Sequence, residues 1–160
     1  MLGPAAAGLI GLLFVVVTLT SGRERSETAR GQALYLTPTA LQFAVVMTFS
    51  AVAMAPRMAP VATASIFSLI ALVGLVNATL AAIGIASPRA GMEPPHWSDF
   101  WMYGVTPVVG YLALCAACVE VWMRVEWAAY ALAGVLLTLL LVGIRNAWDL
   151  VTWIAPMRGG

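Results

Sequence analysis

The chain has 160 residues, of which 62% are hydrophobic and only 9% are charged, and its formal net charge at pH 7 is +1. Its mean hydropathy of +0.94 excludes an ordinary soluble domain and places it among integral membrane proteins. The eight basic residues, all Arg, are scattered along the chain, so we expect no nucleic-acid partner. Both cysteines lie in an apolar stretch, which implies no disulfide framework.

The first apolar stretch, Leu2–Thr20, would form a helix about 28 Å long, which is enough to span a bilayer. The alternative is a cleaved signal peptide, which needs basic residues before the apolar run. Here Arg23, Arg25 and Arg30 follow the run instead. We therefore expect a retained helix with its N-terminus outside.

A charged loop is expected over residues 21–31, and Thr37-Pro38 marks the entrance of a second helix, 35–55. The segment Pro56–Pro60 predicts a tight turn, because proline ends one helix and suits the first turn of the next. A third helix then follows over 60–85.

Four Pro and Gly residues make 87–99 the longest expected loop. A fourth helix is predicted over 100–121, where Pro107 should introduce a kink. After a short charged loop, a fifth helix is predicted over 127–153.

The sequence thus predicts an all-α bundle of five transmembrane helices in one domain, 1–160, with spans at about 2–20, 35–55, 60–85, 100–121 and 127–153. With the N-terminus outside, the inner segments would hold five Arg and the outer segments two, which favours N-out and C-in. The Arg-only basic set and the many Ala residues indicate a GC-rich bacterial genome. We therefore expect a multi-pass protein of the bacterial cytoplasmic (inner) membrane.

The fifth helix ends with charged and polar residues in a place where charge is costly. On a helical wheel, Arg145 and Asp149 share an arc with Thr138, Gly134 and Ala131, which are residues that allow membrane helices to pack closely. We therefore expect this arc to face other helices. We further expect Arg145 and Asp149 to reach Asn77 or Gln42.

A candidate polar cluster follows from the topology, because most strongly polar residues of the spans fall in the cytoplasmic third. Its members are Gln42, Asn77, Tyr103, Arg145, Asn146 and Asp149. The alternative is that Arg145 and Asp149 only anchor the helix at the headgroups, beside Trp148 and Trp153.

Two other features point weakly to chemistry. Cys115 and Cys118 have redox-motif spacing, but no second cysteine pair exists to pass electrons on, so packing is favoured. His96 cannot supply both axial ligands of a haem, and its spacing from Glu93 and Asp99 matches no metal site. We expect no metal, no cofactor and no catalytic residue.

The C-terminal half carries the segments Trp101-Met102-Tyr103-Gly104, Pro107, Tyr111 and Gly143–Thr152. It resembles a group of small bacterial membrane proteins of unknown function with a W-x-Y-G...P...Y helix and a G-I-R/H-N-A-W-D-x-V-T ending. The resemblance covers about sixty residues from Trp97 and implies a helical inner-membrane protein without implying an activity.

The sequence is compatible with three functions. The first is a non-enzymatic structural or accessory subunit, in contact with membrane lipids and assembling with itself or a membrane-protein partner through small-residue faces. The second is a small transporter or channel, which would need polar side chains at several depths. The third is a quinone-linked thiol redox protein.

Overall fold

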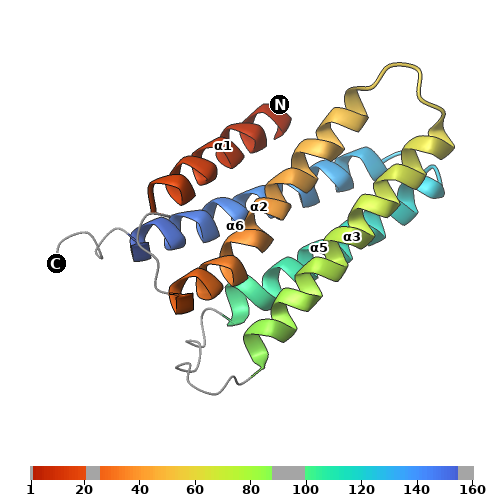
Figure 1. The fold of residues 1–160 in the computed structure, drawn as a ribbon. Coiled ribbons are helices and arrows are strands. Elements are labelled where there is room, and N and C mark those ends of the chain that lie inside the picture. The colour runs from red at the N-terminus through yellow and green to blue at the C-terminus, as the bar shows by residue number, and fades with distance from the viewer. Residues whose placement is uncertain (1, 21–25, 88–99, 155–160) are drawn as a thin grey trace.

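The protein is an all-α bundle, as predicted, in a computed structural model that describes residues 2–20, 26–87 and 100–154. Every regular element in these ranges is helical (Figure 1). In chain order the elements are α1 (Leu2–Thr20), α2 (Ser26–Met54), α3 (Pro60–Ala86), the π-helical segment η1 (Phe100–Val105), α5 (Thr106–Trp122) and α6 (Ala128–Ile154).

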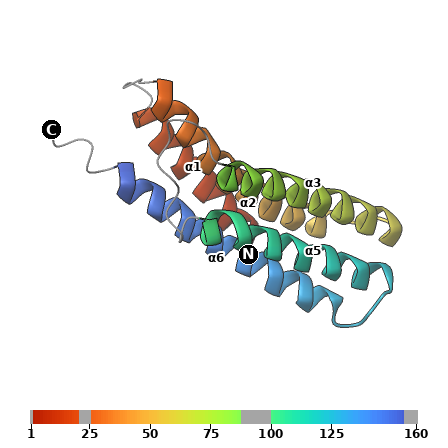
Figure 2. The ribbon, with the colours of Figure 1, turned by 90° about the horizontal axis from the view of Figure 1, so that it is seen from below.

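Four helices form a closed ring in which α2 packs on α3, α3 on α5, α5 on α6 and α6 on α2. Helix α1 lies outside this ring against α2 and α6 (Figures 1 and 2). The turns at residues 55–59 and 123–127 are short, so the helices that they join run antiparallel, as in up-and-down bundles.

The described helices confirm a multi-pass membrane protein. Four stretches are long and apolar enough to cross a bilayer: Leu36–Met54, Pro60–Ala86, Phe100–Trp122 and Ala128–Asp149. Helix α1, Leu2–Thr20, is also apolar along its length. Many large apolar side chains are exposed around the bundle, which suits a surface that hydrocarbon solvates.

Helices in a bilayer gain little from hydrophobic burial against one another, so close packing holds them together. In the core, the rings of Phe49 and Phe67 stack with centroids 4.5 Å apart. The Tyr111 ring of α5 lies directly on the backbone of Gly74 in α3. The Phe43 ring of α2 lies in the same way on Gly143 of α6.

The predicted helix ends agree with the structure except in α2. This helix begins at Ser26, so most of the loop predicted over 21–31 is helical, and Pro38 lies inside the helix instead of at its entrance. The stretch before Pro38 contains Ala29, Gln32, Ala33 and Leu34, all good helix formers, which explains why the helix extends beyond the apolar span. Near Pro107 the structure has the π-helical segment η1.

Candidate functional site

Pro107 determines the backbone hydrogen bonding of η1, at one end of the bundle. In a π-helix the amide of residue i+5 donates to the carbonyl of residue i, so the Met102 carbonyl would need the amide of residue 107. Proline has no amide hydrogen. The side chain of Asn146 on α6 supplies a donor instead, with Nδ2 3.4 Å from the Met102 oxygen. The Thr106 hydroxyl donates to the neighbouring Trp101 carbonyl at 2.9 Å.

Tyr103 makes a second link between the same two elements. Its hydroxyl donates to the backbone carbonyl of Asn146 at 2.8 Å, and both residues are buried. Tyr103 also packs against Ile85, near the end of α3. The two predicted members of the polar cluster are therefore in direct contact, and with Ile85 they bring η1, α3 and α6 together.

Gln42 on α2 also bonds to a backbone carbonyl of α6. Only 2% of this residue is exposed, and Nε2 donates to the Leu139 carbonyl of α6 at 2.8 Å. Leu139 lies seven residues, or about 10 Å of helical rise, before Asn146. Gln42 therefore joins α2 to α6 at a separate level from the Tyr103–Asn146 contact.

The remaining predicted members are not fully buried. Asn77 is half-buried, and its side chain donates to the Val73 carbonyl of its own helix at 2.8 Å. Arg145 is exposed and Asp149 is half-buried. The prediction that Arg145 points inward and reaches Asn77 or Gln42 is wrong.

The inward face of α6 explains this error. It is formed by Leu132, Leu136, Leu139, Gly143 and Asn146, all buried. The arc that we expected to face inward is largely turned outward, with Gly134, Thr138 and Arg145 exposed. The helical wheel groups the residues correctly, but close packing on Gly143 and the Asn146 bonds select the other face.

The outward arc is hollowed beside α5. A groove of about 360 Å³, here called the α5–α6 groove, runs between the two helices. It is lined by Thr106, Val109, Gly110, Ala113, Tyr130, Ala131, Gly134, Val135, Thr138, Leu139 and Val142. Small residues create it, since a Cβ added at Gly134 would meet no atom within 4 Å. From the sequence we identified these small residues, but we expected them to pack against another helix.

Thr39 and Asn146 are both buried polar residues. Thr39, only 1% exposed, was not predicted, although it lies three residues before Gln42 and so on the same helix face. The Oδ1 atom of Asn146 is buried and has no hydrogen-bond partner among the described residues. Asn146 is thus fixed through its Nδ2 and its backbone.

The described ranges contain two cysteines but no cluster of metal ligands. In the described ranges no three His, Cys, Asp or Glu side chains come together as metal ligands. Cys115 is half-buried, Cys118 is buried, and both are free thiols. The predictions for His96, Glu93 and Asp99 concern positions outside the described residues, as do those for the Trp153 side chain.

The fold and the site together define a multi-pass helical membrane protein whose buried polar groups join one helix to another. Comparisons with protein-family models, with curated proteins and with solved structures find no match for the chain.

Proposed function

We propose that the protein is a non-enzymatic structural or accessory subunit that assembles with itself or with a membrane-protein partner. The observation that carries the proposal is the outer face of α1. Gly8 and Gly11 are exposed there, and a Cβ added at either would meet nothing within 4 Å. By contrast, Gly74 and Gly143 are covered by rings from within the chain.

An uncovered glycine face in a membrane helix suits a second helix, because the two backbones can approach closely. Pro4, Gly8, Gly11 and Val15 are all exposed and follow one another at helical spacing, so they form one continuous stripe. The stripe carries no charge and no large side chain before Val15.

The way in which the polar side chains are used also supports a structural role. Gln42, Tyr103 and Asn146 each bond to a backbone carbonyl of another element. Such bonds join helices and contribute about 0.6 kcal/mol each. They leave few polar groups to line a transport pathway within the described spans.

The test is disulfide cross-linking in native membranes. Cysteine is introduced at Gly8 or Gly11 in a chain with Cys115→Ala and Cys118→Ala, two changes that we expect to be silent. We expect a cross-linked dimer, or a cross-link to one partner of defined mass. Cysteine at Leu69, an exposed α3 residue, is the matched control and should give little product. Equal cross-linking from all three positions, or none from any, would refute the proposal.

A further inference from the structure

The α5–α6 groove is open to the surroundings of the bundle at the depth of the bilayer. Its lining residues belong to the spans Phe100–Trp122 and Ala128–Asp149. Along α6 it extends from Tyr130 to Val142, which is about 18 Å of helical rise. One leaflet of hydrocarbon is about 15 Å deep. The groove is therefore about as long as the hydrocarbon layer of one leaflet is deep.

The lining is suited to hydrocarbon. Two of its three hydroxyl groups are already engaged within the chain, with Thr138 donating to the Gly134 carbonyl at 2.9 Å and Thr106 to the Trp101 carbonyl at 2.9 Å. The third hydroxyl belongs to Tyr130, at the end of the groove away from Arg145. Small residues, among them Ala113, Ala131 and Gly134, contribute to its lining.

A positive charge stands at one end of this groove. Arg145 is exposed and lies seven residues after Thr138, which places it on the same face of α6 and about 10 Å further along. Its long side chain can extend along the helix toward the headgroup level. Trp148, which is 68% exposed, marks that interface on the same helix.

We propose that the α5–α6 groove is a binding site for an anionic phospholipid, with an acyl chain in the groove and the phosphate at Arg145. Charge complementarity selects this occupant, because a guanidinium binds phosphate oxygens with paired hydrogen bonds. The outer face of α1 has no charge at its described positions and lacks this feature. Asp149, one turn beyond Arg145 on the same helix, carries a negative charge that opposes the binding of an anion there.

The experiment is native mass spectrometry of the full chain in detergent, with phosphatidylglycerol or phosphatidylcholine of identical acyl chains added. We expect phosphatidylglycerol adducts to form with roughly fivefold higher affinity, the effect of one Arg at a membrane surface. Arg145→Gln should abolish this preference, and it should weaken phosphatidylcholine binding less than phosphatidylglycerol binding, because the choline cation already offsets the phosphate charge. Asp149→Asn should keep or strengthen it. Arg124→Gln, at an exposed site on another segment, is the matched control and should bind as wild type.

Filling the groove tests the acyl chain separately. Gly134→Leu should weaken adducts of both lipids, whereas Ala133→Leu, at an exposed neighbour outside the lining, should not. Helical circular dichroism confirms that each variant folds. Unchanged lipid preference in Arg145→Gln, or unchanged adducts in Gly134→Leu, would overturn the proposal. A disulfide dimer through cysteine at Thr138 would also overturn it, since a second copy would then fill the groove. None of these outcomes depends on assembly through α1.

Discussion

The hydrogen bond made by the Asn146 side chain depends on Pro107, although the two residues lie on different helices. The proline leaves the Met102 carbonyl without a backbone donor, and the Asn146 side chain supplies one across the bundle. An orphaned carbonyl is expensive in hydrocarbon, because no water is present to replace the lost bond. The energetic role of Asn146 should therefore depend on which residue occupies position 107.

This dependence can be measured with a double-mutant cycle. We expect Asn146→Ala to destabilise the wild type more than it destabilises a Pro107→Ala variant, in which residue 107 regains an amide hydrogen. The difference should be about 0.6 kcal/mol, the average for a side-chain hydrogen bond between membrane helices. Thermal unfolding in detergent gives the four stabilities.

Tyr103→Phe provides the control for this cycle. Its hydroxyl donates to the backbone carbonyl of Asn146, which residue 107 does not affect, so its cost should be equal in both backgrounds. If Asn146→Ala also cost the same in both backgrounds, the link between Pro107 and Asn146 would be absent.

At the scale of elements, rings that lie on glycines determine how closely the helices approach. The Tyr111 ring occupies the place that a Cβ on Gly74 would need, and Tyr111 itself is only 3% exposed. Packed α3 and α5 therefore cannot accept even one methyl group at this position without moving. Gly134 on α6 is the opposite case, with open space above it.

We expect Gly74→Ala to lower the stability of the bundle by about 1–3 kcal/mol, the usual cost of overpacking a core. Gly134→Ala should be neutral or stabilising by up to about 1 kcal/mol, because alanine is the better helix former and meets no neighbour. Unfolding midpoints in one detergent compare the pair directly. Equal midpoints for the two variants would show that α3 and α5 are not packed through Gly74.

The residues of the polar cluster were predictable, but the direction in which they point was only partly so. Gln42, Tyr103 and Asn146 stand out because polar side chains are rare in apolar spans, and each is buried. A helical wheel shows which residues share a face, but it cannot show which face meets the bundle. For α6 the choice depends on the Phe43 ring and on the Met102 carbonyl, which belong to segments distant in sequence.

For the molecule as a whole, the positions of the helices could be predicted from the lengths of the apolar stretches and from the positions of the prolines. Helices α1, α3 and α6 lie within a residue or so of the predicted ranges. The extension of α2 to Ser26 was missed because it lies beyond the apolar span, where hydropathy carries no information. The π-helical form of η1 was also missed, because proline predicts a disturbance without specifying its hydrogen-bond register.

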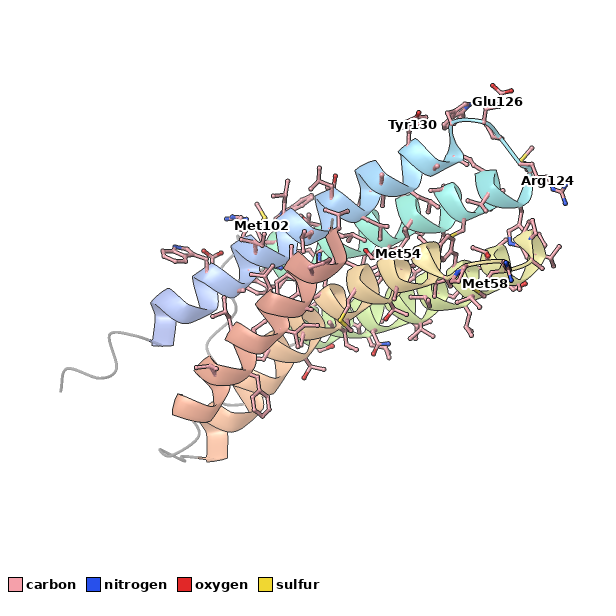
Figure 3. The ribbon with its side chains drawn as sticks, turned by 90° about the horizontal axis from the view of Figure 1, so that it is seen from above. Met54, Met58, Met102, Arg124, Glu126 and Tyr130 are labelled. Carbon is pink, nitrogen blue, oxygen red and sulfur yellow. The ribbon has the colours of Figure 1, made fainter. Side chains whose placement is uncertain are left out.

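The orientation in the membrane is a prediction from the Arg distribution. The turns at 55–59 and 123–127 carry Arg57 and Arg124, and they lie at one end of the bundle, where Figure 3 labels Met58, Arg124, Glu126 and Tyr130. We expect this end to be outside, because the other segments hold most of the Arg residues.

Cysteine labelling in intact cells tests this orientation, again in a chain without Cys115 and Cys118. An impermeant reagent should label cysteine at Arg57 or Arg124. Cysteine at Ser26, and at Gly91 outside the described residues, should be protected until the membrane is permeabilised. The reverse pattern would invert the topology and place Arg145 in the outer leaflet.

Helix α6 is synthesised after the described segments that it contacts. The Gln42 amide and the Tyr103 hydroxyl both donate to its backbone, and the Met102 carbonyl accepts from its Asn146 side chain. During synthesis, α2 and η1 therefore reach the bilayer with polar groups whose final partners do not yet exist. Until α6 is inserted, these groups need other partners, such as water or lipid headgroups. We expect a chain truncated before Ala128 to be degraded faster than the full chain, because these groups then stay without their α6 partners.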